Sequence, residues 1–467
     1  MGSTLRRASF RALGILLLLA TGACSDEPGR STPPDTVADT IAAEVSADVS
    51  APDLVADEVT VLATPKESDR LFDDTAPTPH FDLEVQPADW EWLSHNAGLE
   101  EYVPATLTYQ GQSSTDAAVR YKGAFGSLFS CLDANGELIC DKLPLKVSFN
   151  EYDKAGRFLG LRKLLFHSCT RDGSCLRERL AYRLFLDAGL RAPRVVHATL
   201  SINGSAPSLY ALVEYVDKEF LEDHFDEPGG NLYKERWPGI LDPQYYVSGL
   251  RTNETVADIS RVLAFSEALQ SATEATFNEA VDPFIDRGAM ATYNAVDQLI
   301  NNWDGIWKLY CSGSLCNNHN YYLYEDPSDD RLVVIPWDLD NTFGQPNADL
   351  GRSWSDTSPE ACAIEALQIP GLPGDLGILA PQCDPLLRGL MLQNWEAYRA
   401  ALDALLTGSN TNLESVLERL ERYRATIRPL IEADPDAPPL ADWDAEVVKL
   451  RYILIQQYEE AQTLVDE

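Results

Sequence analysis

The chain has 467 residues, of which 73 are Asp or Glu and 37 are Lys or Arg, so its formal net charge is −36. Hydrophobic residues make up 45% of the chain, which is enough for packed cores in one large domain or in two to three smaller ones. Nucleic-acid binding and electrostatic docking on an anionic membrane both need a cationic surface, so the excess of acid argues against both functions.

The first segment, residues 1–23, has the features of a signal peptide. Three arginines precede the apolar run 13–20, which is too short to span a bilayer. The residues before Cys24 then resemble the cleavage site of bacterial lipoproteins, with Thr21 where Leu is usual. We therefore expect a lipid on Cys24, and an ordinary signal peptide cleaved near Ala23 is the alternative.

The next segment, residues 24–75, is predicted to be the lipidated cysteine followed by a disordered acidic tether. It is rich in Asp, Ala, Val, Thr and Pro and almost lacks aromatic residues. No later stretch reaches the ~20 apolar residues of a transmembrane helix, so we expect the lipid to be the one membrane contact. The predicted location is outside the cytoplasm, either anchored in the cell envelope or secreted.

The folded body is predicted to begin at residue 76 with a β-rich lobe. Alternating apolar residues and turn signals indicate strands, and Asn203-Gly204 is a strong hairpin turn. We expect strands at 81–85, 102–109, 118–123, 143–149, 195–202 and 210–215, and helices at 89–93 and 175–190.

The second half of the body is predicted to be mainly helical. Apolar residues recur there with helical periodicity, and one β-rich stretch interrupts them. We expect helices at 256–281, 285–302, 384–406, 412–432 and 441–465, and strands at 321–324 and 332–336. The predicted fold class is therefore α+β, with a β-rich N-lobe over about 76–218 and a helical C-lobe over about 219–467.

Eight cysteines remain besides Cys24, and they lie in four local couples. Many connectivities are open, but pairing within each couple is the simplest, because each couple closes a short polar loop. Zinc is the competing interpretation, and the spacings and the few histidines argue against it. Disulfides would agree with export to an oxidising compartment. The couples are Cys131 and Cys140, Cys169 and Cys175, Cys311 and Cys316, and Cys362 and Cys383.

The candidate chemistry lies in residues 301–344. Asp304 opens a loop after a predicted helix, and Asn320 starts the next strand. Asp338 and Asp340 end the partner strand, and their i,i+2 spacing predicts that they share one face. Phosphoryl transfer uses one carboxylate beside the attacking hydroxyl, and Asp and Asn ligands that hold magnesium on the phosphates. A helix-capping turn or a structural Ca²⁺ loop is the alternative.

Eight short stretches of the chain, spread over about residues 80–430, together resemble the spore-coat-protein-H (CotH) kinase family. Each stretch is weak alone, but their order and spacing are specific. They are residues 119–123, 145–149, 160–164, 176–180, 202–204, 214–217, 231–234 and 336–340.

The resemblance implies a divergent protein-kinase-like fold and the transfer of the ATP γ-phosphoryl group to Ser or Thr of proteins with Mg²⁺ or Mn²⁺. By position, Asp304 would be the catalytic base, and Asp338 and Asp340 would bind the metal with Asn320 as a further ligand. The sequence departs from the kinase pattern here, because Asn320 follows Asp304 by 16 residues across a loop that holds two cysteines.

The resemblance also implies a phosphate-binding lysine, Lys146, with Glu178 as its ion-pair partner. Lys122 is a rival beside the Gly123–Gly126 loop, which departs from the family pattern, and Lys163 and Lys234 are further rivals. A plain strand-edge role for Lys146 stays open. Trp337 would pack on adenine or would be a core residue.

The predicted function is an exported protein Ser/Thr kinase that acts on surface proteins. The alternative is a structural protein of the cell surface on a degenerate kinase-like fold, with Ca²⁺ bound to the acidic residues. A hydrolase is disfavoured, because the chain has six histidines and neither a GxSxG nor an HExxH motif.

Overall fold

The computed structural model describes residues 66–467 except 124–127, 129–130, 134–135, 137, 256–257, 314, 345–352 and 368–375. The predicted signal peptide, Cys24, the tether up to residue 65, and part of the Gly123–Gly126 loop lie outside the described residues.

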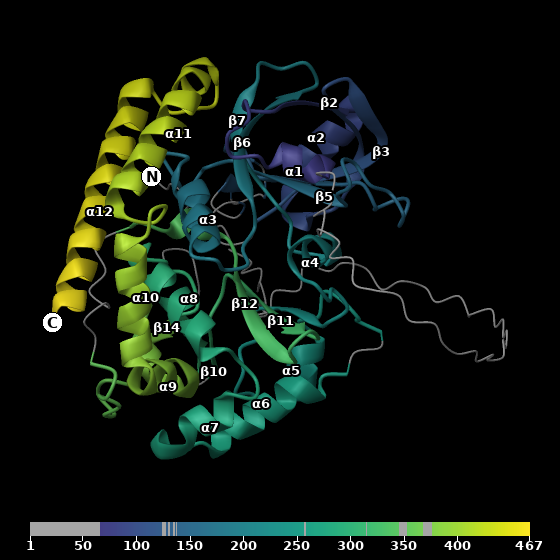
Figure 1. Cartoon of the computed structure of the whole chain (residues 1–467). Helices are drawn as coiled ribbons and strands as arrows, with labels where there is room; N and C mark the ends of the chain where they lie inside the picture. The colour runs from purple at the N-terminus through teal and green to yellow at the C-terminus, as the bar shows by residue number, and fades with distance from the viewer. Residues whose placement is uncertain are drawn as a thin grey trace, which may run out of the picture. The chain divides into compact units, whose positions relative to one another are not determined.

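The N-lobe is a closed β-barrel of seven described strands in the order β1-β2-β3-β4-β5-β7-β6 (Figure 1). Strands β1 and β6 pair in parallel and close the barrel, whereas the other neighbours pair antiparallel. The predicted strands and the Asn203-Gly204 hairpin are confirmed, and β5 is an additional strand. The bounds are β1 His80–Val85, β2 Val103–Tyr109, β3 Gln112–Tyr121, β4 Leu145–Ser148, β5 Lys163–His167, β6 Val195–Ile202 and β7 Ser208–Val213.

The alternation of side chains along the barrel strands separates two cores. Leu164 and Phe166 of β5 point into the barrel, whereas Leu165 packs in the core that extends through the C-lobe. Lys146 is paired across the sheet with Leu165, so it shares this outer face of the barrel. The sheet therefore directs several of its polar residues toward the C-lobe.

The C-lobe contains most of the helices and two small sheets, in the orders β12-β11-β8 and β10-β9-β14-β13. Helices α2 (Pro87–His95) and α3 (Arg177–Asp187) belong to the N-lobe part of the chain. The C-lobe helices are α4 Lys218–His224, α5 Pro243–Val247, α6 Ser260–Ser271, α7 Phe277–Val281, α8 Arg287–Leu299, α9 Pro385–Gln393, α10 Trp395–Thr407, α11 Leu413–Ala433 and α12 Leu440–Asp466. Its strands are β8 Leu232–Lys234, β9 Leu309–Ser312, β10 Leu315–Asn317, β11 Tyr321–Asp326, β12 Arg331–Pro336, β13 Glu365–Ala366 and β14 Leu376–Leu379.

Two of the predicted long helices are wrong, because each is broken into shorter helices in the structure. The first is interrupted after α6, where Ala272 is extended and Thr273 and Thr276 form a reciprocal cap for a new turn. The second is interrupted between α9 and α10 at Asn394, whose side chain accepts a hydrogen bond from Arg287. Capping stops the first helix, and the second stops at Asn394, whose backbone leaves the helical region with a φ of −131°, although the apolar periodicity continues past both places.

The folded body begins earlier than residue 76. Helix α1 spans Glu67–Leu71, and Asp74 accepts hydrogen bonds from Arg179 of α3 and from the Tyr423 hydroxyl of α11. The predicted end of the tether at residue 75 is therefore wrong. The segment is poor in aromatic residues, but it is ordered by ion pairs with groups far along the chain, which composition cannot show.

Four disulfides are present among the described residues, and they confirm the predicted pairing within each couple. Such bonds are typical of proteins that fold outside the reducing cytoplasm. Among the described residues, no helix combines the length and the apolar character needed to cross a membrane. The bonds are Cys131–Cys140, Cys169–Cys175, Cys311–Cys316 and Cys362–Cys383.

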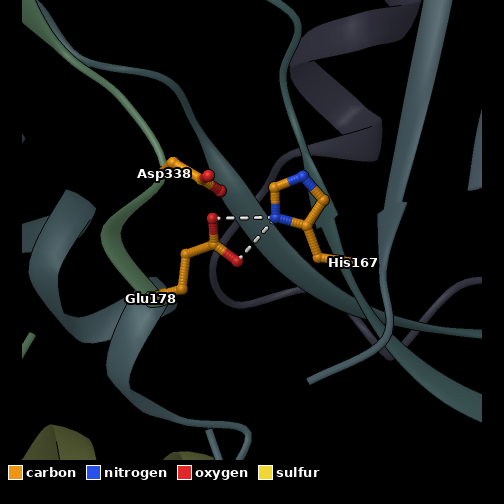
Figure 2. Close-up of side chains that lie close together, drawn as sticks. All are labelled: His167, Glu178 and Asp338. Carbon is orange, nitrogen blue, oxygen red and sulfur yellow. Dashed lines mark hydrogen bonds and ion pairs between the residues drawn. The ribbon is translucent and has the colours of Figure 1, made fainter. Parts of the chain in front are cut away.

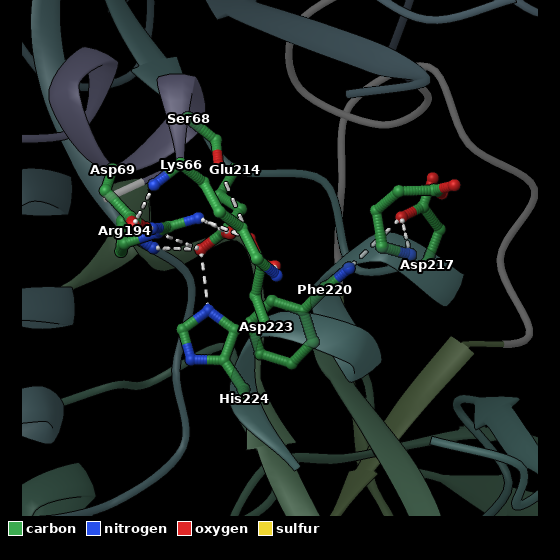
Figure 3. Close-up of polar contacts among 10 residues, drawn as sticks. Lys66, Ser68, Asp69, Arg194, Glu214, Asp217, Phe220, Asp223 and His224 are labelled. Carbon is green, nitrogen blue, oxygen red and sulfur yellow. Dashed lines mark hydrogen bonds and ion pairs between the residues drawn. The ribbon is translucent and has the colours of Figure 1, made fainter. Parts of the chain in front are cut away.

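A buried ion-pair network joins α1, the start of β6 and α4 (Figure 3). Glu214 is its centre: the carboxylate accepts hydrogen bonds from the Arg194 backbone N–H at 2.9 Å and from His224 Nε2 at 3.1 Å. The Arg194 guanidinium also pairs with Glu214, with Asp69 of α1 and with Asp223 of α4. Residues of α1, which lie inside the predicted tether, are thus tied to the segment that connects the two lobes.

This network predicts an acid-sensitive contribution to stability. Burial alone would raise the pKa of Glu214, but the hydrogen bond from His224 and the charge of Arg194 lower it to about 2 from the ordinary 4.5. Because the folded pKa is depressed, the contribution is present above pH 4.5 and is lost as the pH falls toward 2. It corresponds to about 3 kcal/mol of unfolding free energy. Urea unfolding of wild type and Glu214→Gln at pH 7 and pH 3 should show a smaller acid-induced loss in the variant, and an equal loss in both proteins would contradict this.

Candidate active site

A cluster of charged side chains lies where the barrel meets the C-lobe. Lys122 follows β3, His167 ends β5, Glu178 is in the first turn of α3, and Asp338 follows β12. The Lys122 ammonium is 2.5 Å from His167 Nε2, and His167 Nδ1 is 2.9 Å from each oxygen of the Glu178 carboxylate. Figure 2 shows the Asp338 carboxylate turned toward the same ring, and ligand atoms of His167, Glu178 and Asp338 all lie within 4.8 Å of one another.

The pKa shifts in this cluster indicate that it holds an excess of buried negative charge. Burial, and then the charge of Asp338, raise the pKa of Glu178 and of Asp340 well above their ordinary values. Burial lowers the pKa of Lys122 although Asp338 and Glu178 favour its charged form. Burial and the neighbouring Lys122 also lower the pKa of His167 to about 3, so the imidazole is neutral. Perturbed groups that gather in this way mark candidate functional sites.

The chemistry of this donor set fits a divalent cation. Carboxylate oxygens are the ligands that Mg²⁺ and Mn²⁺ prefer, and a cation would offset the mutual repulsion of Asp338 and Asp340. The predicted strand position of these two residues is wrong, because β12 ends at Pro336. Asp338 instead adopts a left-handed backbone with φ of 56°, and Asp340 lies in the 3-10 helix η4, Leu339–Asn341. A turn, and not strand alternation, therefore brings them together.

Asp304 is the centre of a second group of polar contacts. Its carboxylate accepts hydrogen bonds from the Tyr310 hydroxyl, from Asn320 Nδ2 at 3.0 Å and from Asn341 Nδ2 at 3.3 Å. Burial raises the pKa of Asp304, Asp338 acts in the same direction, and the hydrogen bond from Tyr310 opposes the shift. The charges of Asp304 and Asp338 thus influence each other, so the two carboxylates belong to one region.

The long spacing between Asp304 and Asn320 is explained by an inserted hairpin. Strands β9 and β10 form it, and the Cys311–Cys316 disulfide joins them. The chain then returns, and the Asn320 side chain donates to the backbone carbonyl of Asp304 as well as to its carboxylate. The structure therefore brings Asn320 to Asp304 despite the insertion, and its role as a metal ligand stays a prediction.

Lys146 and Trp337 lie at the edges of the cluster. The Lys146 ammonium is 4.6 Å from the centre of the Tyr215 ring and 3.5 Å from its hydroxyl, and Lys163 lies over the same ring at 4.8 Å. Trp337 is 5% exposed and packs edge-on against His167, while the Lys122 ammonium is 5.8 Å from its ring centre. Trp337 thus has the surroundings of a core residue that forms one wall beside Lys122.

Three residues of the site were not singled out in the sequence. His167 is the last residue of the short strand β5. Side chains alternate along a strand, so counting from Lys163 would have placed His167 on the same face as Lys163. Asn341 directly follows the Asp338–Asp340 turn, so its neighbourhood was the available signal. Tyr310 lies in the inserted hairpin, and nothing in the sequence indicates that it returns to Asp304.

The sequence of the chain matches one protein family and one curated relative. The profile of the family described as CotH kinase protein matches residues 119–459. Inner spore coat protein H of Bacillus subtilis (strain 168) is 22% identical over 283 residues, which are 57% of this chain and 69% of that protein.

Two solved structures also match part of the chain. The Helicobacter pylori proinflammatory kinase CtkA has 12% identity and a TM-score of 0.27, over 69% of this chain and 94% of that one. HipA, from a toxin–antitoxin complex of Shewanella oneidensis MR-1, has 15% identity and a TM-score of 0.25, over 65% of this chain and 59% of that one. Because the family match spans well over half of its length, the chain belongs to the CotH kinase protein family and has the α+β, kinase-like fold with a β-rich N-lobe and a mainly helical C-lobe.

Proposed function

We propose that the protein is an exported protein kinase that transfers the γ-phosphoryl group of ATP to Ser or Thr residues of surface proteins, with Mg²⁺ or Mn²⁺. One observation carries the proposal: Lys122 from the barrel contacts His167, and ligand atoms of His167, of Glu178 from α3 and of Asp338 from the turn after β12 lie within 4.8 Å of one another. Phosphoryl transfer needs a lysine that contacts the phosphates. It also needs carboxylates that bind the metal, and both must lie at the same place.

The residues of the cluster take separate roles in this proposal. Asp338 and Asp340 would hold the divalent cation, which supplies positive charge to the phosphates when it is bound. Lys122 would contact a phosphate oxygen, and Glu178 would orient the lysine. Lys146 beside Tyr215 is a second candidate for a phosphate contact. Because the pKa of Lys122 is lowered by burial, an approaching phosphate would favour its charged form.

Asp304 would orient the attacking hydroxyl of the protein substrate and accept its proton. A raised pKa suits a group that must bind a proton during the reaction, and the cause here is burial, assisted by Asp338. Hydrogen bonds from Tyr310, Asn320 and Asn341 hold the carboxylate in one orientation. Positioning of this kind is a large part of catalysis in phosphoryl transfer.

Export of the kinase is supported by the four disulfides and by the predicted signal peptide. The acceptors would then be proteins of the cell surface, and an N-terminal lipid on Cys24 would keep the enzyme near them. Mass-spectrometric mapping of phosphorylated Ser and Thr in surface proteins mixed with the enzyme and ATP tests this part of the proposal.

Nucleotide binding separates the kinase from a structural protein that binds Ca²⁺. Calorimetry of the folded protein with ATP should show saturable heat in the presence of Mn²⁺ or Mg²⁺. The double variant Asp338→Asn/Asp340→Asn should lose at least about tenfold in metal-dependent ATP affinity. The matched control is Asp329→Asn/Asp330→Asn, which removes two exposed carboxylates from the turn of the β11–β12 hairpin and should bind like wild type. Stabilisation by Ca²⁺ together with no nucleotide heat would support the structural protein instead.

A further inference from the structure

A buried histidine stands between the lysine and the glutamate of the candidate active site. In protein kinases the corresponding lysine and glutamate form a direct ion pair. Here both Glu178 oxygens face His167 Nδ1, and Lys122 faces His167 Nε2. We propose that His167 is a positioning residue that replaces the direct lysine–glutamate contact with two hydrogen bonds and so holds Lys122 for the phosphates of the nucleotide. This inference rests on the proposed kinase function.

The proton on the imidazole ring follows from the charge states of its two neighbours. With Lys122 as the ammonium and Glu178 as the carboxylate, the ammonium only donates hydrogen bonds, so Nε2 accepts from Lys122. A neutral imidazole carries one N–H, which is then on Nδ1 and donates to the Glu178 carboxylate. The ring therefore satisfies one partner that only donates and one that accepts. An amide or a hydroxyl side chain cannot reach both partners in the same directions.

The surroundings of His167 leave the ring little freedom. The side chains of His167 and Glu178 are 8% and 5% exposed. The Trp337 ring packs edge-on against the imidazole with the centroids 6.4 Å apart. The backbone N–H of Lys122 donates to the Pro144 carbonyl at 3.0 Å, which ties the end of β3 to the next strand. Because the ring is held on three sides, a shift of Glu178 would also shift Lys122.

The loop between His167 and Glu178 is built to keep the two elements in register. The Cys169–Cys175 disulfide closes this loop within a few residues of both side chains. Asp172 inside the loop accepts a hydrogen bond from the Arg177 backbone N–H at 2.7 Å, which satisfies the first N–H of α3. The loop between β5 and α3 is therefore closed by a disulfide and by this hydrogen bond. This linkage supports a fixed geometry for the histidine–glutamate contact.

The arrangement also couples Lys122 to helix α3. Glu178 belongs to α3, and this helix packs on η4, which carries Asp340. Tyr182 of α3 accepts a hydrogen bond from the Asp338 backbone N–H at 2.9 Å. A displacement of α3 would thus move Glu178, which contacts His167. It would also move the turn that carries Asp338 and Asp340. Through His167 the same displacement reaches the lysine on the barrel.

A competing role for His167 is direct metal ligation, since its ligand atom lies within 4.8 Å of those of Glu178 and Asp338. We favour positioning because both ring nitrogens already have hydrogen-bond partners in the structure. The two roles differ in what a variant loses. A ligand role predicts weaker metal binding without nucleotide, whereas positioning predicts weaker use of ATP at unchanged metal affinity.

The test compares His167→Ala, His167→Gln and His167→Asn in the full folded chain. A glutamine amide can take the place of Nε2 and an asparagine amide that of Nδ1, so each keeps one of the two contacts. We expect His167→Ala to lower kcat/KM for ATP roughly 10- to 100-fold, as for the loss of a hydrogen bond to a charged group. His167→Gln should recover part of the loss because it still accepts from Lys122, and His167→Asn should recover less.

The matched control is His197→Gln. His197 is also a buried histidine of the barrel, and it contacts Arg179 of α3 and the Cys175 carbonyl. Its replacement should leave kcat/KM within about twofold of wild type, and thermal melting of each variant reports any general loss of stability. Mn²⁺ affinity without nucleotide is measured for the same proteins.

The outcomes separate the inference from the proposed function. An inactive wild type that binds no ATP overturns the proposed function itself. The positioning role is overturned if the wild type is active, Lys122→Met is inactive and His167→Ala keeps a kcat/KM within about twofold of wild type. The proposed kinase function is unaffected by that result. A tenfold or larger loss of Mn²⁺ affinity in His167→Ala without nucleotide assigns the histidine as a ligand and also overturns the inference. Reduced kcat/KM with unchanged Mn²⁺ affinity and partial recovery in His167→Gln supports it.

Discussion

Replacement of Asp304 by Asn is expected to lower kcat by about 10²- to 10⁴-fold, the usual effect of removing a catalytic base. The wild-type carboxylate accepts hydrogen bonds from Tyr310, Asn320 and Asn341. An amide in its place cannot take a proton at the pH of the reaction, and its NH₂ group would face donors. The KM for ATP should change little, because Asp304 is placed to act on the protein substrate. Phosphate transfer to a Ser/Thr acceptor, followed with radiolabelled ATP, measures the effect.

The control for this prediction is Asp326→Asn. Asp326 ends β11, and its carboxylate accepts hydrogen bonds from Ser328 in the turn of the β11–β12 hairpin. Its replacement removes the same charge from the same lobe, and the rate should stay within about twofold of wild type. Full activity of a folded Asp304→Asn variant would show that another group is the base.

Replacement of Lys122 by Met is expected to lower kcat/KM for ATP by about 10²- to 10³-fold, the range found when one donor to a developing charge is removed. The structure places this lysine among Asp338, Asp340 and Glu178, whose charges favour its protonated form. Methionine keeps the apolar part of the side chain and removes the ammonium. Calorimetry should show weaker ATP binding in the same variant.

Lys146→Met is the matched comparison, because Lys146 is buried on the neighbouring strand of the same barrel. Its ammonium lies over the Tyr215 ring, so we expect a smaller loss, below about tenfold, from the changed packing there. The reverse order, with Lys146→Met the more damaging variant, would assign the phosphate contact to Lys146. Equal and small effects in both variants would contradict the proposed cluster.

Much of the barrel was predictable because its strands carry local signals. The alternation in residues 81–85 reappears as β1, with alternate side chains buried, and Asn203-Gly204 forms the expected hairpin turn. Strand β5 was missed because a five-residue strand buried on both faces has little alternation. The interruptions after α6 and α9 were missed because one or two residues with non-helical backbone end each helix, although the apolar periodicity continues past them.

The candidate site was predictable in part, since residue types and spacing in 301–344 singled out Asp304, Asp338 and Asp340, and the family resemblance added Glu178. What the sequence could not show is that Asn320 returns to Asp304 across the stapled hairpin. The sequence placed Lys146 of β4 ahead of Lys122, and it could not show that Lys122, which directly follows β3, contacts His167. The choice depends on which one faces the turn after β12, and that turn comes from the other lobe.

The sequence by itself determined the excess of acid, the order of a β-rich lobe before a helical one, and the family, and it predicted the pairing of neighbouring cysteines. These properties depend on composition and on contacts between residues close in the chain. Only the tertiary structure decided that α1 and Asp74 belong to the folded body and that His167 stands between Lys122 and Glu178. Both findings depend on polar side chains from different elements, which come into contact only once the chain has folded.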